Sequence, residues 1–421
     1  MRILFVTPYV PSLIRLRSFN FLRELSKRHE VVVLTMWESE REREDLAALN
    51  ALYPAVGLHL SRARAYTNCL RALPGSTPLQ GSYCQTPEFT RLVDLALDPR
   101  APGREVLPAP LRRPFDLVHV EHMRAAYVGR AIPLTMPAVV DSVDCITLLM
   151  ERTRQHSHRL WQRLLAAFEL SRMAGYEAKV LGYFDYVTVC TPDDAVVMRE
   201  LIPGLRRVAP VNHCVDLDYF RMGGQLREPD SMVFVGKMSY HANATAVNFF
   251  VREVLPRIRA LRPSARLQIV GSDPPWDVRV LARQHDVTIT GYTPDVRPYL
   301  GRARVAVAPM VVKVGIQSKI IEAMAAGTPV VVTTAGTEGL EATPGRDLLV
   351  ADDPDEFARQ VVRLFDDDVL WRRLIVAGRQ YVEIHHRWDV AAEQLEQVYA
   401  DAVAARESAT SVLSESVGVT P

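Results

Sequence analysis

Residues 314–331, VGIQSKIIEAMAAGTPVV, carry polar side chains within a run that is otherwise apolar. The preceding run, ARVAVAPM, is typical of a buried strand, and Gly327 followed by Thr-Pro predicts the end of a helix that starts near Ser318. Free backbone N–H groups and the helix dipole favour an anion at a helix N-terminus. The residues around this N-terminus therefore predict a phosphate site: Gly315, Ile316, Gln317 and Ser318.

Lys319 and Glu322 are the charged residues of this predicted helix. A cation in the first turn opposes the helix dipole unless an anion lies nearby, so Lys319 favours a bound phosphate. A carboxylate one turn further on is placed to accept hydrogen bonds from vicinal hydroxyls, such as those of a ribose. The alternative is an i,i+3 surface pair worth only a few tenths of a kcal/mol. Spacing alone leaves both interpretations open.

Short apolar runs alternate with helical patterns through both halves of the chain. RILFVTPYV, VVVLTM, FDLVHVEHM, PAVVDSVD and DYVTVCTPDD occur in the first half, and SMVFVGKMS, ARLQIVGSD, VTITGYTPD, ARVAVAPMV and TPVVVTTAG in the second. This alternation predicts an α/β protein with two doubly wound parallel sheets. Such sheets bind ligands at the carboxyl ends of their strands, so we expect the functional residues in the loops that follow these runs.

The length of 421 residues fits two domains. We expect a Rossmann-like domain over residues 1–210, a linker over 211–230 and a second Rossmann-like domain over 231–384. A helix over about 385–405 should pack back on the first domain. The Ser/Thr-rich end, 406–421, is expected to be disordered.

The composition is that of an ordinary globular protein, with 48% hydrophobic residues, 24% charged residues and a net charge of +1, so nucleic acid is not expected as a partner. Residues 1–210 contain 27 Lys and Arg against 22 Asp and Glu, and the remainder contains 23 against 27. The basic first half suits an anionic acceptor or peripheral contact with an acidic membrane surface, although a solvated surface explains it as well.

The sequence predicts a cytoplasmic protein, with the inner face of the membrane as the place of any peripheral contact. The longest apolar runs are too short to span a bilayer, and Pro8 and Pro11 interrupt the N-terminal run too early for a signal peptide. The five scattered cysteines form no CxxC pair, which argues against a disulfide framework and against a zinc site.

Several segments taken together resemble GT-B glycosyltransferases of family four, and more narrowly the bacterial exopolysaccharide-type sugar transferases. They are GIQSKIIEAMAAGTPVVVT, VFVGKMSYHANATAVNFF, VTITGYTPDVRPYLGRARVAVAP and CVDLDYF, with a weaker likeness at RILFVTPYVPSLIRLRSFNFLREL, FDLVHVEH and VVDSVD. The resemblance implies two facing Rossmann-like domains with a cleft between them. It also implies retaining transfer of a sugar from a nucleotide-diphosphate sugar, a co-substrate and not a cofactor, to a hydroxyl of a glycan, a lipid-linked or a small-molecule acceptor.

The same resemblance assigns roles in the second domain. It places Glu322 at the donor ribose, Gly236 and Lys237 at the diphosphate, and Tyr292 and Thr293, which follow Gly291, at the nucleobase. Val314 stands where the family has a sugar-contacting glutamate, and Lys319 replaces a proline that is common in the family. The family has a second basic residue a few positions after the glycine-basic pair, and here Ala242-Asn243 stand near its place. Lys319 is therefore expected to supply the missing charge for the diphosphate.

In the first domain, the family's Gly-Gly loop is replaced by PSLIRLRS. Arg15 and Arg17 could approach a phosphate or an anionic acceptor from this loop, or form a solvated basic loop. In HVEHM the resemblance favours His122, ahead of His119, as the histidine beside the reacting sugar, because Glu121 fills the commonest histidine position; a structural histidine is the alternative. Weaker candidates on the acceptor side are Glu121, Asp141 and Asp144.

No motif supports a bound metal. DLD at 216–218 and DDD at 366–368 imitate the DxD of another glycosyltransferase fold, but they lie in the linker and in a turn between helices. Lys319, the remaining catalytic candidate, and the helix N-terminus are expected to neutralise the leaving diphosphate. Two alternatives stay open: a GT-B nucleotide-sugar epimerase or hydrolase, and a catalytically silent GT-B subunit that binds a nucleotide or a partner protein.

Overall fold

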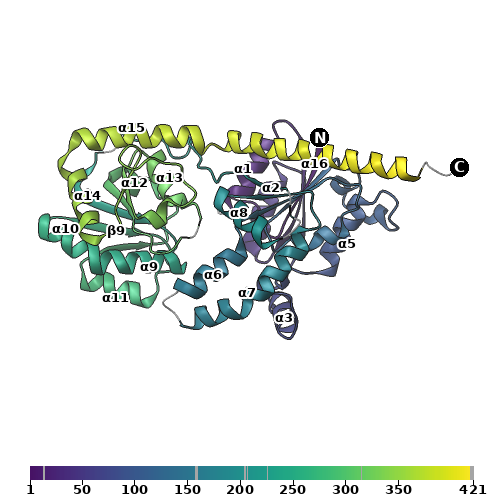
Figure 1. The fold of residues 1–421 in the computed structure, drawn as a ribbon, viewed down its shortest axis with the longest axis horizontal. Helices are drawn as coiled ribbons and strands as arrows, with labels where there is room; N and C mark the ends of the chain where they lie inside the picture. The colour runs from purple at the N-terminus through teal and green to yellow at the C-terminus, as the bar shows by residue number, and fades with distance from the viewer. Residues whose placement is uncertain are drawn as a thin grey trace. The chain divides into compact units, whose positions relative to one another are not determined.

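The computed structural model describes residues 1–12, 15–156, 160–202, 205, 207–224, 226–313 and 315–417, without the side chains of residue 156 and of those after residue 408. The chain divides into two compact units. Unit 1 comprises Met1–Gln155, Trp161–Val211 and Ala391–Pro421, and unit 2 comprises His156–Leu160 and Asn212–Val390. Figure 1 shows the elements of both units.

The described residues of unit 1 form a seven-stranded sheet with the order β3-β2-β1-β4-β5-β6-β7. All of its strand pairs are parallel. The strands are β1 (Arg2–Thr7), β2 (Glu30–Trp37), β3 (Ala55–His59), β4 (Leu117–Glu121), β5 (Ala138–Val143), β6 (Tyr186–Val189) and β7 (Val208–Pro210). Strands β1 and β4 are almost fully buried along their length, as expected for parallel strands covered on both faces.

Helices connect these strands and cover both faces of the sheet. They are α1 (Leu16–Leu25), α2 (Glu40–Asn50), α3 (Arg62–Ala72), α4 (Leu79–Ser82), α5 (Pro87–Leu97), α6 (Ile146–His156), α7 (Leu160–Leu181) and α8 (Pro192–Leu201), with short 3-10 turns at Arg104–Val106, Ala109–Leu111 and Ala126–Ala131. Ser39, Thr86 and Thr191 cap α2, α5 and α8 by accepting backbone N–H groups on their side chains, which fixes where these helices begin.

The described residues of unit 2 form a six-stranded parallel sheet with the order β10-β9-β8-β11-β12-β13. The strands are β8 (Glu228–Val235), β9 (Arg266–Val270), β10 (Thr288–Gly291), β11 (Ala303–Ala308), β12 (Val330–Val332) and β13 (Leu349–Val350). Phe234 and Val233 belong to different apolar clusters because successive side chains of a strand point to opposite faces.

Two groups of helices cover this sheet. One cluster joins the strands to α9 (His241–Phe249), a π-helical turn (Phe250–Val254), α10 (Leu255–Leu261), α11 (Trp276–Gln284) and α14 (Pro354–Asp366). The other joins them to α12 (Arg297–Arg302), α13 (Ser318–Ala325) and α15 (Asp368–His385), and a 3-10 turn lies at Thr334–Thr337. In Figure 1, α9 and α11 accordingly lie on one side of the sheet, and α12, α13 and α15 on the other.

The last helix, α16, spans Trp388–Val417, and Ala391–Pro421 belongs to unit 1. Its buried residues recur at helical spacing: Ala391, Ala392, Leu395, Val398, Tyr399 and Ala402. The helix continues through part of the 406–421 stretch, for which the composition predicts disorder. Ala and Glu in AVAARESATSV are good helix formers, and they extend the helix beyond its buried face.

The predicted α/β class with two doubly wound parallel sheets is confirmed. The apolar runs do not predict three short strands, β3, β7 and β13. These strands lie at sheet edges, where weak apolar runs such as AVGLH are only half-buried and resemble loops. Strand β8 begins at Glu228, inside the range expected for the linker.

Among the described residues, no helix is long and apolar enough to cross a membrane. All five cysteines are free, and four of them are buried.

Gly271 gives a test of the packing at the carboxyl ends of β8 and β9. A Cβ at this position would lie 1.9 Å from the carbonyl oxygen of Gly236. We expect Gly271→Ala to destabilise unit 2 by about 2 kcal/mol, because backbone has to move. Differential scanning calorimetry measures this as a lower Tm.

Gly175→Ala is the matched control, because a Cβ on that helical glycine meets nothing within 4 Å. The added methyl group should stabilise α7 by up to about 1 kcal/mol. Equal Tm values for the two variants would contradict the close approach described for Gly271.

Candidate functional site

Two glycines bring the loops after β8 and β9 into direct contact. The N–H of Gly236 donates to the carbonyl oxygen of Val270 at 2.9 Å, and a side chain on Gly271 would collide with the Gly236 backbone. Glycine is the residue that permits such an approach. The close approach of the Gly236 and Gly271 backbones therefore fixes the position of Gly236-Lys237, the pair expected at a diphosphate.

Asn243 on α9 supports this pair. Its Nδ2 donates to the carbonyl oxygen of Lys237 at 2.9 Å, whereas its Oδ1 is buried without a hydrogen-bond partner. The Lys237 side chain is exposed, with Nζ 3.9 Å from Asp273 Oδ2. At this distance and exposure the ion pair is weak, so Lys237 can reorient toward a ligand. Asn243 is thus a backbone support and not a substitute for the missing basic residue.

The loop before α13 follows β11, which pairs with β8. The two predicted phosphate-binding loops therefore begin at the ends of neighbouring strands. Gly315 has φ of 71°, and its N–H donates to Glu338 Oε2 at 2.8 Å. The Gln317 amide returns a hydrogen bond to the Gly315 carbonyl oxygen at 3.1 Å. The hydroxyl of Ser318 lies 3.0 Å from His213 Nε2. Ile316, between Gly315 and Gln317 in sequence, is half-buried.

Glu338 and His213 were not predicted, because they lie far from this loop in sequence and only the fold brings them to it. Glu338 is 7% exposed, and its carboxyl group holds the Gly315 N–H at the start of the loop. Residue 314, where the family's glutamate is replaced by valine, lies outside the described residues. Only their contacts with Gly315 and Ser318 in the folded chain identify Glu338 and His213 as residues of this site.

Lys319 and Glu322 do not pair with each other among the described contacts. The Lys319 amine donates to Gln317 Oε1 at 2.6 Å and lies 5.6 Å from the centroid of the Phe234 ring. Burial lowers the pKa of Lys319 to about 8, with Glu322 opposing the shift. Burial raises the pKa of Glu322 to about 7, with Lys319 opposing. Burial thus disfavours the charged form of both side chains, as in a site where ligand groups supply the missing interactions.

The Gly291-Tyr292-Thr293 turn follows β10. Gly291 has φ of 72°, which favours glycine, and the Tyr292 side chain is 70% exposed. The hydroxyl of Thr293 donates to the carbonyl oxygen of Asp295 at 3.0 Å and holds the turn. The tyrosine ring is free to stack on a planar group, but β9 separates this turn from the loop after β8.

A second cluster of polar residues lies in unit 1, after β1, β4 and β5. Arg17 Nε donates to Asp141 Oδ2 at 2.6 Å, and both side chains are buried. Arg17 Nη2 also donates to the Val211 carbonyl oxygen at 3.0 Å. Burial would raise the pKa of the Asp141 carboxyl, but Arg17 outweighs it and holds the pKa below its usual value. Arg17 is therefore neither a solvated loop residue nor placed to approach a ligand.

Arg15 differs from Arg17 although both belong to the same basic loop. Its side chain is exposed, and its guanidinium carbon lies 4.2 Å from the centroid of the Tyr9 ring. Arg15 can therefore meet an anion.

Glu121 is buried beside the Arg17–Asp141 pair. Its Oε1 accepts a hydrogen bond from the Ser18 hydroxyl at 2.5 Å, and Oε2 has no partner. Burial, followed by the negative charge of Asp141, raises the pKa of Glu121 to about 8. The raised pKa favours the protonated, neutral form of this side chain at physiological pH.

His122 follows β4 with a strained backbone. It has φ of 70°, its N–H donates to the Asp141 carbonyl oxygen at 2.7 Å, and its Nδ1 accepts the N–H of Arg124 at 3.2 Å. Val143, the last residue of β5, also has φ of 70°, a rare conformation for a β-branched residue. Burial, with Arg124 and Arg15, lowers the pKa of His122 to about 3, so the imidazole is neutral. Strain of this kind clusters at functional sites.

His119 lies in the core of unit 1. It is fully buried, stacks on Phe5 with ring centroids 4.4 Å apart, and its Nδ1 lies 2.9 Å from the Tyr399 hydroxyl. These contacts describe a structural histidine. Asp144 lies half-buried just after β5, and its carbonyl oxygen accepts the Ser142 hydroxyl at 3.0 Å.

The two DxD imitations have structural roles. Asp216 accepts the N–H groups of Asp218 and Tyr219 at 3.0 and 2.9 Å, which closes a turn. Across the described chain, no group of three or more His, Cys, Asp or Glu side chains is arranged to hold a metal ion.

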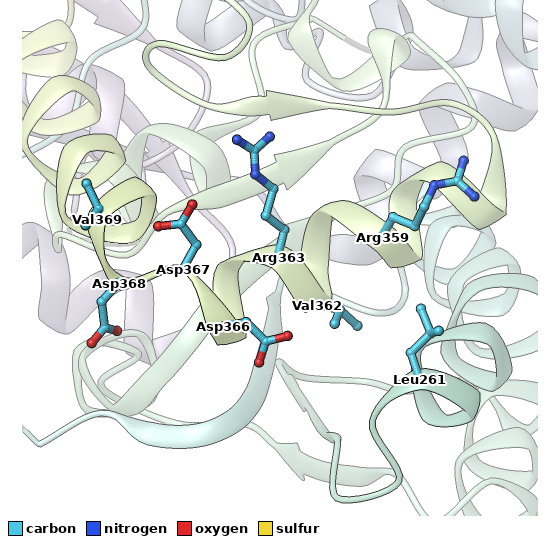
Figure 2. A pocket seen from close by; sticks show the side chains of 8 residues that line it. All are labelled: Leu261, Arg359, Val362, Arg363, Asp366, Asp367, Asp368 and Val369. Atoms are coloured by element: carbon cyan, nitrogen blue, oxygen red, sulfur yellow. The ribbon is translucent and has the colours of Figure 1, made fainter.

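The DDD run lines a hollow beside α10 and α14, shown in Figure 2. Asp367 caps α15 by accepting the N–H of Leu370 at 2.9 Å. Asp366 pairs with Arg262, and Asp368 pairs with Arg304. Figure 2 shows the three carboxylates pointing apart, so they share no ligand position.

Residues 229–367 match the family described as glycosyl transferases group 1. A GDP-mannose-dependent monoacylated alpha-(1-6)-phosphatidylinositol monomannoside mannosyltransferase of Corynebacterium glutamicum is 24% identical over 344 residues, covering 71% of this chain and 82% of the relative. Residues 229–367 are therefore similar to glycosyl transferases of group 1.

Solved structures extend the likeness over both units. Sucrose-phosphate synthase from Thermosynechococcus elongatus is 16% identical with a TM-score of 0.66, covering 96% of this chain and 99% of the other. HepE of Anabaena in complex with UDP and glucose is 12% identical with a TM-score of 0.65, covering 94% and 99%. These matches confirm the GT-B fold class of two Rossmann-like units. The narrower resemblance to exopolysaccharide-type transferases stays a prediction.

The burial of His119 predicts a pH-dependent stability of unit 1. Burial lowers its pKa from 6.5 to about 4, so the unfolded chain binds more protons between these values. The free energy of unfolding should therefore fall as the pH drops through this window, by at most about 3 kcal/mol. His119→Gln should lose less Tm between about pH 7 and pH 5 than the wild type does.

His285→Gln, at the C-cap of α11, is the matched control and should keep the pH slope of the wild type, because it leaves the His119 site unchanged. An unchanged slope in His119→Gln would show that protonation of this histidine does not limit stability.

Proposed function

We propose that the protein is a glycosyltransferase that transfers a sugar from a nucleotide-diphosphate sugar to a hydroxyl acceptor. The observation that carries the proposal is the start of α13, where Lys319 and Glu322 lie one turn apart, with perturbed pKa values and no ion pair between them among the described contacts. The group 1 match over residues 229–367 and the UDP complexes of structural neighbours support it. Unit 2 then binds the donor, and unit 1 binds the acceptor.

The donor diphosphate lies between the Gly236-Lys237 loop and the first turn of α13. Because the pKa of Lys319 is about 8, its amine is mainly charged at physiological pH and can neutralise the diphosphate. Glu322 accepts hydrogen bonds from the ribose hydroxyls, and Tyr292 stacks on the nucleobase next to Thr293. Gly315, Ile316, Gln317 and Ser318 offer backbone N–H groups to the phosphates.

The reaction retains the anomeric configuration. The leaving phosphate oxygen takes the proton of the acceptor hydroxyl on the face from which it departs, so the protein need not supply a strong base. Lys319 and the helix N-terminus stabilise the charge that develops on the diphosphate, which is the part a metal ion plays in other enzymes.

His122 is the residue of unit 1 assigned to the reacting groups. Its neutral imidazole can exchange a hydrogen bond with a sugar or acceptor hydroxyl without adding a charge. Arg15 meets an anionic acceptor, Glu121 supports this side of the site, and Asp144 lies near its edge. The mannoside acceptor named for the Corynebacterium relative favours a glycan or a lipid-linked acceptor, in polysaccharide or glycoconjugate biosynthesis.

A panel of nucleotide sugars tests the function. Each donor, beginning with GDP-mannose and UDP-glucose, is incubated with the protein, and transfer, slow hydrolysis and isomerisation are followed by NMR, which also reports the anomeric configuration. We expect hydrolysis of one donor, and transfer once an acceptor is supplied. Nucleotide binding without turnover would indicate a silent subunit, and an isomerised sugar would indicate an epimerase.

Lys319→Ala and Glu322→Ala should each weaken nucleotide binding or turnover by about tenfold or more, because each removes one or two charge-assisted hydrogen bonds. Isothermal titration with the nucleotide diphosphate measures the first effect. Lys27→Ala and Glu341→Ala are the charge-matched controls, since both side chains are exposed and lie outside the donor site. Wild-type kinetics and binding in Lys319→Ala and Glu322→Ala would refute the assignment.

His122→Gln should lower kcat by about a hundredfold while leaving the nucleotide Kd unchanged, because His122 belongs to unit 1 and the nucleotide binds unit 2. Single-turnover kinetics and titration separate the two quantities. Loss of nucleotide binding together with kcat, at an unchanged Tm, would contradict a role for His122 at the reacting groups alone.

A further inference from the structure

The first half of α7 exposes a row of large apolar side chains. Trp161, Leu164, Leu165 and Phe168 are 59%, 63%, 44% and 48% exposed. Spacings of three and four residues place them on one face of the helix. Grouped exposure of this kind marks an interaction site, whereas single exposed apolar residues are ordinary.

The end of α3 adjoins this row. Tyr66, Leu70 and Leu73 are 62%, 67% and 45% exposed, again at helical spacing. Arg172 of α7 joins the two helices, since its Nη2 donates to the Leu73 carbonyl oxygen at 3.4 Å and its guanidinium covers the Phe168 ring at 4.7 Å. The α3–α7 surface is defined by Tyr66, Leu70, Leu73, Trp161, Leu164, Leu165 and Phe168.

The segments that carry this surface are basic, and so is the neighbouring helix α6, whose Arg154 carbonyl oxygen accepts a hydrogen bond from Arg163 Nε at 3.0 Å. Residues 60–75, 146–155 and 161–172 contain seven arginines and two glutamates. One of the glutamates, Glu169, is buried and paired with Arg172, and Arg64 is paired with Glu88 of α5. Positive charge therefore surrounds the apolar side chains without a comparable number of acids.

The same face of α7 continues into a pocket of about 430 Å³ within unit 1. Gly175 and Lys179 follow Phe168 and Arg172 at helical spacing, and Arg130 also lines the pocket. Tyr176 and Tyr183 supply its aromatic wall. Apolar side chains and cations thus succeed one another along one helix face.

We propose that the α3–α7 surface seats unit 1 on a membrane surface that contains anionic lipid. Trp161, Leu165 and Phe168 enter the boundary between headgroups and acyl chains, while the surrounding arginines meet lipid phosphates. A second copy of the chain fits less well, because a symmetric contact would bring two basic surfaces face to face. The inference needs no bound donor and does not rest on the proposed glycosyl transfer.

Sedimentation with phospholipid vesicles tests this surface. The full chain is mixed with vesicles of phosphatidylcholine alone, or of phosphatidylcholine with phosphatidylglycerol, at low and at high salt. We expect binding to the anionic vesicles that weakens with salt. The double variant Trp161→Ser, Leu165→Ser should lower the partition coefficient about tenfold or more, and Arg163→Gln should lower it about fivefold on anionic vesicles alone.

The double variant Trp276→Ser, Leu52→Ser is the matched control, because these side chains are 77% and 65% exposed elsewhere. It should bind vesicles as the wild type does. Absent binding to anionic vesicles, or equal binding by the two double variants, would overturn the proposal. A change in oligomeric state of the α3–α7 variant without lipid would assign the surface to a second copy. Donor hydrolysis without lipid reports separately on the glycosyltransferase.

Discussion

Both sheets are parallel and covered by helices on both faces, and this constraint determines where polar chemistry can occur in the chain. A strand buried on both faces has room for apolar side chains along its length, as in Ile3, Leu4, Phe5 and Val6 of β1. Charged groups are tolerated where the strands end and the backbone turns outward. The clusters that we propose for the donor and for the acceptor both lie at such carboxyl ends, where doubly wound sheets bind ligands.

The cluster of unit 1 shows how a buried charge is kept. The Arg17–Asp141 pair loses its hydration, and removal of one partner from such a pair typically costs about 3–5 kcal/mol. The same carboxylate acts on its neighbours, since it helps to keep Glu121 protonated. The backbone carbonyl oxygen of Asp141 also accepts the N–H of His122 and helps to hold that residue at its unusual φ. One pair thereby sets both the charge state and the geometry of this cluster.

The sequence was sufficient for the fold class, for most strands and for α13, because apolar periodicity and the capping glycine at Gly327 are local signals. It was not sufficient for Arg17, which lies in a run that looks like a basic loop, although Phe21 and Leu22 repeat on the same buried face. Glu338 and His213 were invisible for a different reason, since their contacts with the loop before α13 depend on distant chain segments. Gly271 could have been found, because a glycine directly after a strand often marks a close backbone approach.

The return of Ala391–Pro421 to unit 1 has a consequence for biosynthesis. During translation, the ribosome must complete all of unit 2 before the last piece of unit 1 emerges. Until then His119 lacks its contact with the Tyr399 hydroxyl. The part of unit 1 that the buried residues from Ala391 to Ala402 cover also stays exposed. Unit 2 is nearly continuous in sequence and can fold while it is being made. The amino-terminal unit is therefore the first to begin folding and the last to finish.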